Sequence, residues 1–315
     1  MRMREPESRD YLCCGLRVRS IVGLPWEEVA PEGDAQVTVK AGVIESAARA
    51  EAEALFEGTD LILDVPGVGR FRATGGSEVV IDAEPAAREA DVLLYLCGSV
   101  FGAIWLQRGL LPLHGSTVSN AIGSVAFIGP SGAGKSSLAA HLAEAGWTVV
   151  ADDVSVIRPL GEGFGVWAGS RRVKLARDAL ASIDLDVQSL PHVGGTRDKY
   201  HLTLRPEGSS LEMVPLRRIY LLSGWGDAVA AEAASGLDAI DIVGGHTYRQ
   251  EFVKPLGLEP GWLQQVVRVA RTVPVYRLVR PRGFERTADV ARFILDHLTA
   301  EGSGLRGGEG SAGRP

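Results

Sequence analysis

The chain has 315 residues, enough for two domains or one large one, and its 45% hydrophobic and 23% charged residues are typical of globular proteins. A formal net charge of −6 argues against a nucleic-acid-binding protein whose affinity comes from neutralising phosphates. Three cysteines, two of them adjacent (Cys13 and Cys14), exclude a disulfide framework and indicate a reducing compartment, and no Cys/His spacing resembles a zinc site.

The N-terminal residues do not resemble a signal peptide. Residues 1–10 are mostly charged, and we expect them to be disordered. The apolar residues that follow are interrupted by Arg17 and Arg19. Residues 92–106 form the longest apolar run, but they fall short of the roughly 18 residues of a membrane span, so we predict a buried core helix. We therefore expect a cytoplasmic protein with no membrane partner.

Residues 11–110 are predicted to form a small, mostly β N-terminal domain. Alternating apolar runs predict strands at residues 16–21, 36–43, 60–65, 68–73 and 78–82. The pair Gly75-Gly76 separates the last two runs, which is typical of a hairpin, and we expect an antiparallel sheet. Residues 44–56 are rich in Ala and Glu and favour a helix. Residues 85–111 predict a long helix that connects the two halves of the chain.

Residues 111–153 carry the motif on which the functional prediction depends. Residues 111–118 predict a strand, 120–123 a tight turn and 124–128 a second, buried strand. The next residues match G-x-x-x-x-G-K-[ST], and residues 136–145 predict a helix. The predicted phosphate loop consists of Gly129, Pro130, Ser131, Gly132, Ala133, Gly134, Lys135 and Ser136, with Ser137 directly after it. A glycine-rich turn without a ligand is the alternative, but the flanking strand and helix favour a phosphate site.

The residue types of the loop suit a nucleoside triphosphate bound with Mg²⁺. Gly129, Gly132 and Gly134 lack a Cβ and adopt positive φ readily, so backbone amides can turn toward phosphate oxygens. The helix N-terminus adds the positive end of its dipole. Lys135 is expected to contact the β- and γ-phosphates, and Ser136 to bind Mg²⁺. The sequence therefore predicts a site for ATP and Mg²⁺.

A pair of carboxylates follows the next predicted strand, residues 147–151. Asp152 and Asp153 come directly after it, beside the phosphate loop. One carboxylate can bind Mg²⁺ and the other can accept a proton from an attacking hydroxyl, provided that the strand ends or bends there. A solvated strand end is the alternative. His114 lies in the strand that precedes the loop strand, where a core histidine and a catalytic residue both fit the pattern.

The rest of the chain alternates between predicted strands and helices. Strands are predicted at residues 154–157, 164–167, 201–204, 216–222 and 273–279, and helices at residues 175–180, 236–245, 246–256, 261–271 and 287–298. Cations near residue 172 (Arg171, Arg172, Lys174) and after the glycine hinge 194–195 (Arg197, Lys199) can neutralise a triphosphate. For Arg171 a basic surface loop is the plainer interpretation. Residues 301–315 are glycine-rich and are expected to be a disordered tail.

Taken together, these residues resemble the HPr kinase-like family of serine kinases. The resemblance rests on LPLHGSTV at 111–118, AFIGPSGAGKSS at 126–137 and ADD at 151–153, which occur in that family in the same order and at similar spacing. RRVKL, GGTRDKYHL and GHTYRQ resemble a divergent branch similar to kinases of lasso-peptide and other peptide-modification clusters. The resemblance implies an α/β (α+β) fold, with a phosphoenolpyruvate carboxykinase-like P-loop kinase core over residues 111–300.

The resemblance also implies a role for each matching residue. The loop binds the phosphates and Mg²⁺, Asp152 is the general base, His114 orients that carboxylate, and Asp153 assists in metal binding. Lys199 falls in a downstream basic motif and is assigned to the nucleotide. Ser137 stands where HPr kinases usually have Glu, and their N-terminal domain and phosphorolysis loop are not recognisable, which argues against HPr as the substrate. HPr kinases form hexamers, so a homo-oligomer is expected by resemblance alone.

We therefore expect an ATP-dependent kinase that phosphorylates a Ser hydroxyl of a peptide or protein, with Asp152, His114 and Lys135 as catalytic residues. Two alternatives remain open: a small-molecule kinase of the same fold, and a non-catalytic ATP-binding regulatory protein. The paired aspartates and His114 favour an enzyme, because a nucleotide sensor needs no proton acceptor.

Overall fold

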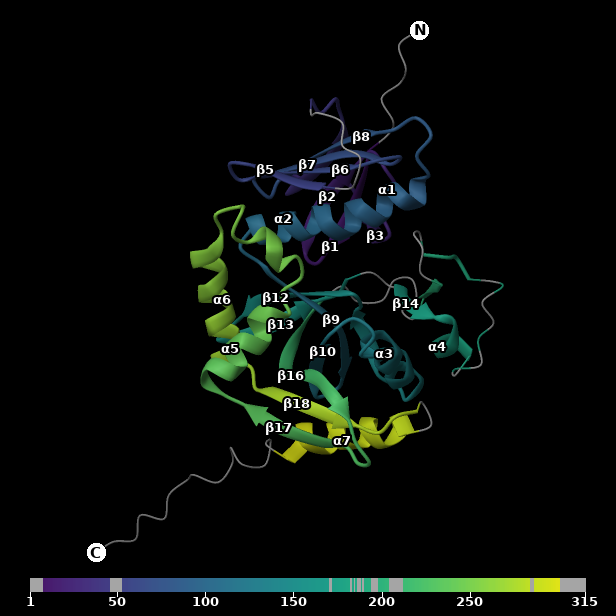
Figure 1. The fold of residues 1–315 in the computed structure, drawn as a ribbon, viewed down its shortest axis with the longest axis vertical. Helices are drawn as coiled ribbons and strands as arrows, with labels where there is room; N and C mark the ends of the chain where they lie inside the picture. The colour runs from purple at the N-terminus through teal and green to yellow at the C-terminus, as the bar shows by residue number, and fades with distance from the viewer. Residues whose placement is uncertain are drawn as a thin grey trace, which may run out of the picture.

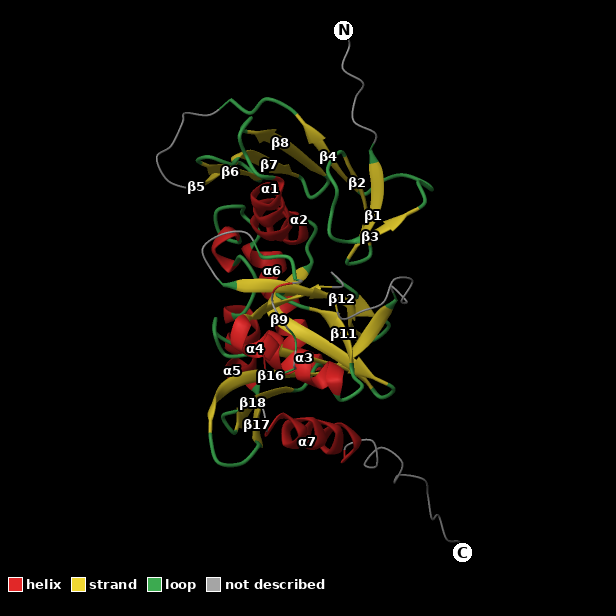
Figure 2. Ribbon diagram, turned by 90° about the vertical axis from the view of Figure 1, so that its right-hand side faces the viewer, coloured by secondary structure: helices red, strands yellow, loops and turns green. Residues whose placement is uncertain are grey.

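The protein has a mixed α/β fold built on two main mixed sheets (Figures 1 and 2). The structure, a computed structural model, describes residues 8–45, 53–169, 172–181, 183, 185, 188, 190–193, 198–203, 212–283 and 286–300. The expectations for residues 1–7, 46–52, 194–197 and 301–315, and for Arg171, lie outside these residues. A long interrupted helix lies between the two sheets in both views.

The N-terminal sheet has eight strands in the order β3-β1-β2-β4-β8-β7-β6-β5. They are β1 (Arg9–Cys13), β2 (Leu16–Ser20), β3 (Glu27–Val29), β4 (Val37–Ala41), β5 (Glu53–Glu57), β6 (Asp60–Val65), β7 (Gly69–Thr74) and β8 (Glu78–Ala83). The pairs β2–β4 and β4–β8 are parallel, so the prediction of an antiparallel sheet is wrong there. Between β2 and β4 the chain forms β3, which pairs with β1, and β4 then runs alongside β2 in the same direction. The sequence alone does not reveal these pairings.

Two local predictions in this sheet are also wrong. β1 begins at Arg9, inside the segment expected to be disordered, and the buried Asp10 accepts hydrogen bonds from Arg17 and Arg19. Glu53–Glu57 is a strand rather than part of a helix. The Ala- and Glu-rich composition favours a helix, but pairing of β5 with β6 overrides that weak preference.

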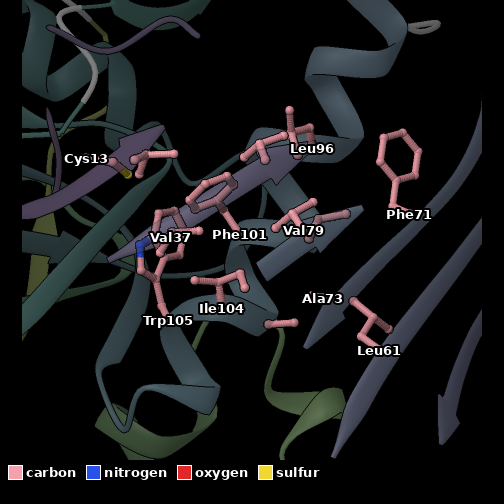
Figure 3. Close-up of a cluster of buried hydrophobic side chains, with 14 of the residues drawn as sticks. Cys13, Val37, Leu61, Phe71, Ala73, Val79, Leu96, Phe101, Ile104 and Trp105 are labelled. Atoms are coloured by element: carbon pink, nitrogen blue, oxygen red, sulfur yellow. The ribbon is translucent and has the colours of Figure 1, made fainter. Parts of the chain in front are cut away.

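The connecting helix consists of α1 (Glu89–Tyr95), a π-helical turn η1 (Leu96–Val100) and α2 (Phe101–Gln107). By length and composition, Glu89–Gln107 is the one helix among the described residues able to cross a membrane. Its side chains instead pack on the N-terminal sheet, where Leu96, Phe101 and Ile104 are fully buried (Figure 3). This packing agrees with the predicted core helix, and a fully buried Phe alone stabilises a fold by about 3–5 kcal/mol relative to Ala.

The second sheet also has eight strands, in the order β10-β9-β12-β13-β16-β18-β17 with β11 beside β9, and β16 pairs back with β10. Its strands are β9 (Leu111–Asn120), β10 (Gly123–Ile128), β11 (Thr148–Ala151), β12 (Val154–Leu160), β13 (Gly163–Trp167), β16 (Met213–Trp225), β17 (Ala230–Ala234) and β18 (Val275–Arg280). The helices are α3 (Lys135–Glu144), α5 (Gly236–Gly245), α6 (Glu259–Thr272) and α7 (Thr287–Ala300). Helices α3 and α7 share one apolar cluster with the sheet, and α5 and α6 share another, so helices cover both faces.

A small ribbon of β14 (Arg172–Ala176) and β15 (Lys199–Thr203) stands beside α3, and α4 (Arg177–Ala181) follows β14. The helix expected at 175–180 therefore begins two residues late, and Lys199 lies in a strand rather than in a loop. The helix expected at 246–256 is wrong, because only a 3₁₀ turn, η3 (Gln250–Phe252), forms there. The start of this segment bonds to β9, because His114 N donates to His246 O and Tyr248 N donates to Pro112 O, and the rest forms short turns such as Gln250 N to Thr247 O.

Candidate functional site

The glycine loop joins the end of β10 to the start of α3. Gly129, Gly132 and Gly134 have φ of 147°, 83° and 83°, in the region that favours glycine. Three neighbouring parallel strands, β10, β16 and β18, end at the same edge of the sheet. In open α/β sheets this carboxyl edge is where ligands bind, so residues at the ends of β16 and β18 arrive beside the loop.

Lys135 is folded back onto the loop. Its Nζ donates to Gly129 O at 2.8 Å and to Pro130 O at 3.1 Å, and the residue is 7% exposed. Desolvation lowers the pKa of Lys135, and Lys199 lowers it further, while Asp152 and Asp153 oppose this. A bound phosphate offers the ammonium stronger acceptors than two neutral carbonyls, so the lysine is available to an anionic ligand.

Asp152 is buried and held at both carboxylate oxygens. Ser116 Oγ donates to Oδ1 at 2.6 Å, and the backbone N of Lys174 donates to Oδ2 at 2.9 Å. Desolvation raises the pKa of Asp152, and hydrogen bonds from Ser116, Lys174 and the loop residue Ser136 only partly offset it. Ser136 is the residue of the phosphate loop that acts on the pKa of this carboxylate.

Asp153 turns the chain so that its side chain reaches the same region. Its φ of 67° is left-handed, a conformation that costs a non-glycine residue about 1–2 kcal/mol and that gathers at functional sites. Oδ2 accepts from Lys174 Nζ at 2.7 Å, and Oδ1 lies 3.7 Å from His114 Nδ1. Desolvation raises the pKa of Asp153, but Lys174, His114 and Lys199 together outweigh it and hold the pKa below its usual value.

His114 lies in β9 and is only half-buried, at the site rather than in the core. Its Nδ1 is 3.0 Å from the carbonyl oxygen of Asp153, and its ring lies 6.0 Å from that of Tyr248. Desolvation and the charge of Lys135 lower the pKa of His114 against the pull of Asp153. The imidazole therefore releases its proton more readily than a free histidine, and its Nδ1 is placed to orient Asp153.

A cavity of about 430 Å³, here called the phosphate-loop cavity, brings these residues together. Of the residues predicted for the site, it is lined by His114, Ser131, Gly132, Gly134, Lys135, Ser136, Ser137, Asp153 and Lys199. Gly129, Pro130 and Ala133 form the loop without lining the cavity, and Asp152 does not line it either.

Sequence reasoning missed three contributors. Trp225 and Arg280 line the phosphate-loop cavity together with Lys174, which the sequence indicates as a candidate cation, and Ser116 holds Asp152. Arg280 donates to Ala133 O, and its guanidinium carbon lies 4.1 Å from the centre of the Trp225 ring, which is 45% exposed. Its buried Nε has no hydrogen-bond partner among the described residues, which suits a bound anion. The order of the parallel strands, unknown from the sequence, is what brings Trp225 and Arg280 here.

The residues present fit Mg²⁺ bound together with a nucleotide. Among the described residues, no group of three or more His, Cys, Asp or Glu is able to hold a metal by itself. Mg²⁺ often takes only one or two protein ligands besides phosphate oxygens and water. The Ser136 hydroxyl and the adjacent Asp152 carboxylate supply such a pair.

The fold and the site define a mixed α/β protein with a phosphate-loop sequence between a buried strand and a helix. No protein-family model matches the chain, and a search of curated proteins finds no match. Among solved structures, the HPr(Ser) kinase/phosphatase from Coxiella burnetii is similar over 61% of this chain and 98% of that chain, at 10% identity and a TM-score of 0.32. This is a weak structural resemblance to an HPr kinase, and no function is transferred from it.

Proposed function

We propose that this protein transfers the γ-phosphoryl group of ATP to the hydroxyl of a Ser in a peptide or protein, on a phosphoenolpyruvate carboxykinase-like P-loop core. One observation carries the proposal. The loop lysine, Asp153 and His114, from separate segments of the chain, line one cavity, and Asp152 adjoins them in the sequence. Phosphoryl transfer needs this combination of positioning, positive charge and a proton acceptor.

The loop and its neighbours bind the nucleotide. Backbone amides of the loop and the N-terminus of α3 face the phosphates, and Lys135 exchanges its two carbonyl acceptors for phosphate oxygens. Lys199 and Arg280 add positive charge at the cavity wall. The exposed ring of Trp225 offers a face on which the nucleobase stacks.

The geometry favours exchanging the roles that the sequence resemblance gave to the two aspartates. Asp152 lies beside Ser136, so we assign Asp152 and Ser136 to Mg²⁺, which when bound neutralises charge on the phosphates. Asp153 has a carboxylate with one oxygen bound to Lys174 and the other 3.7 Å from His114. We assign Asp153 as the group that takes the proton of the acceptor hydroxyl, with His114 and Lys174 orienting it.

Four variants test the proposal. Lys135→Ala is expected to abolish transfer from γ-labelled ATP. Asp153→Asn is expected to bind ATP with Mg²⁺ normally and to lose at least about 10²-fold in kcat, the usual contribution of a general base. Asp152→Asn is expected to lose the Mg²⁺-dependent part of ATP affinity, and its buried amide still accepts from Lys174 N and pairs with Ser116. Glu232→Gln, an exposed residue on β17, is the control.

The outcomes separate the proposal from its rivals. If Asp153→Asn still transfers phosphate, and Asp152→Asn does not but binds ATP with the normal Mg²⁺ dependence, then Asp152 is the general base, as the resemblance implies. Tight ATP binding by the wild-type protein with no labelling of peptides or small alcohols contradicts a kinase and supports a nucleotide sensor. Labelling of small alcohols alone supports a small-molecule kinase.

A further inference from the structure

A second cavity, of about 260 Å³, adjoins the phosphate-loop cavity, and Asp153 and Lys174 line both. Asp152 also lines the second cavity. The rest of its wall includes Trp26, Leu93, Leu94, Cys97, Pro191 and Val193, and we call it the apolar cavity. Two cavities that share a carboxylate and its lysine are arranged for two ligands that react with each other.

The wall of the apolar cavity comes from both halves of the protein. Cys14 and Gly15 form the tight turn between β1 and β2, with φ of 49° and 76°. This turn is fixed to the second sheet, because Arg158 Nη1 donates to Cys14 O at 3.1 Å and a Cβ on Gly15 would lie 2.7 Å from the Trp167 ring. The N-terminal half therefore supplies a fixed wall beside the reacting groups.

The interrupted helix supplies another wall through its π-helical turn. Cys97 and Gly98, both in η1, line the apolar cavity. A Cβ on Gly98 would lie 3.2 Å from Tyr248 Oη, so the helix approaches the segment beside His114 closely at this point. π-Helical turns inside α-helices are rare and frequently mark functional sites.

The charged groups that line the apolar cavity are bonded to one another. Among its described lining residues, the groups with a fixed charge are Asp152, Asp153 and Lys174, and Lys174 Nζ is bound to Asp153 at 2.7 Å. His192 and His201 also line the cavity. The wall formed by Trp26 and Leu94 has no fixed charge to pair with a charged ligand, and burying an unpaired charge there is strongly unfavourable.

We propose that the apolar cavity binds the acceptor as a peptide segment in which the phosphorylated Ser has an apolar neighbouring side chain. This inference rests on the proposed kinase function. The Ser hydroxyl lies at Asp153, and the neighbouring side chain packs against Leu94 and Trp26. A volume of about 260 Å³ suits one or two side chains rather than a folded domain, and the cavity is partly open to solvent, so the rest of the peptide has a way out.

The reaction at the junction of the two cavities balances. The Ser oxygen forms a bond to the γ-phosphorus, the bond from that phosphorus to the β–γ bridging oxygen breaks, and ADP leaves. The hydroxyl proton passes to the Asp153 carboxylate, which Lys174 and His114 hold in place.

The first experiment measures acceptor preference with capped pentapeptides that contain one central Ser. One neighbour of the Ser is Leu, Phe, Asp or Lys, and the other positions are Gly; free L-serine represents a small-molecule source. We expect kcat/KM for the Leu and Phe peptides to exceed that for the Asp and Lys peptides at least about tenfold, the ratio expected when one large apolar side chain leaves water. Equal use of all four peptides overturns the inference, as does L-serine used as well as the best peptide.

The second experiment changes the wall. Ala90 is exposed and lines the cavity, whereas Ala86, which is also exposed, does not line it. Ala90→Trp is expected to raise the KM of the Leu peptide at least about tenfold with ATP affinity unchanged, and Ala86→Trp to leave both unchanged. Leu94→Glu is expected to reverse the preference from the Leu peptide to the Lys peptide, a change that general destabilisation does not produce, and Leu94→Met to retain the original preference.

The results distinguish failure of this inference from failure of the proposed function. If the wild-type protein labels peptides but Ala90→Trp leaves KM unaltered and Leu94→Glu leaves the preference unaltered, the cavity assignment is wrong and the kinase stands. If the wild-type protein binds ATP but labels neither peptides nor L-serine, the kinase function fails and the acceptor assignment falls with it.

Discussion

The phosphate loop contains a matched pair of glycines that tests whether Arg280 is a fixed part of the site. Gly132 and Gly134 share a φ of 83°, so replacing either by Ala imposes the same backbone strain, about 1–2 kcal/mol. A Cβ on Gly132 meets nothing within 4 Å, whereas a Cβ on Gly134 would lie 3.0 Å from Arg280 Nη2. The two substitutions therefore differ mainly in whether they displace Arg280.

Arg280 is poorly placed to move aside. Its Nη2 donates to Ala133 O, and its guanidinium packs over the Trp225 ring. Losing a charged hydrogen bond costs about 1.5–3 kcal/mol in addition to the strain, so Gly134→Ala is expected to destabilise the protein by about 2.5–5 kcal/mol and Gly132→Ala by about 1–2 kcal/mol. Gly132 lines the phosphate-loop cavity, so Gly132→Ala is also expected to weaken ATP binding despite its smaller effect on folding.

Denaturant unfolding of the two variants without nucleotide measures this difference, and a double-mutant cycle assigns it. In an Arg280→Ala background the extra destabilisation of Gly134→Ala is expected to disappear, because the displaced group is no longer there. Equal destabilisation by the two substitutions, or an excess that persists without Arg280, would refute the reasoning.

Three further predictions concern charge, the nucleobase and the core. Lys174→Met removes the cation that holds the pKa of Asp153 low, so that pKa rises and the acid limb of the pH–rate profile moves to higher pH, whereas Lys174→Arg keeps the limb in place. The ionised Asp153 stabilises the folded protein at pH values above its unfolded pKa, and this stability is lost as the pH falls through the lower folded pKa. Thermal melts of Lys174→Met are expected to lack this pH-dependent stability. Trp225→Ala is expected to weaken ATP binding by about 1–3 kcal/mol in calorimetry, and Trp225→Phe to retain most of the affinity. Phe101→Ala is expected to lower the free energy of unfolding by about 3–5 kcal/mol, and a change below about 1 kcal/mol contradicts the packing between helix and sheet.

The elements around the phosphate loop were predictable because their signals are local. A buried run, a glycine loop and a helix follow one another within residues 123–145, and the structure contains β10, the loop and α3 there. Where pairing with another strand decides the secondary structure, the predictions were wrong. Glu53–Glu57 has a helical composition but hydrogen-bonds to β6, and Tyr248 N donates to Pro112 O of β9 instead of continuing a helix.

The candidate site likewise contains residues from a local motif, which the sequence predicts, and residues brought in by strand pairing, which it does not. Lys135, Ser136 and the two aspartates lie in one continuous motif, so their neighbourhood is visible in the sequence. Trp225 and Arg280 are the last residues of β16 and β18 and lie far apart in the sequence. Only the pairing of β16 with β18 shows that they meet. The register Trp225↔Arg280 states this directly, and no sequence period encodes it.

The left-handed backbone of Asp153 connects the local motif to the long-range assembly. Successive side chains of a regular strand point to opposite faces, so two adjacent carboxylates reach one site only where the strand is interrupted. β11 ends at Ala151, and the φ of 67° at Asp153 provides the interruption. Asp and Asn tolerate this conformation better than most residues, so a strained position has a side chain that suits both the backbone and the chemistry. The strain is maintained because Lys174, from β14, binds Asp152 through its backbone N and Asp153 through Nζ. The ribbon of β14 and β15 therefore holds both carboxylates in place.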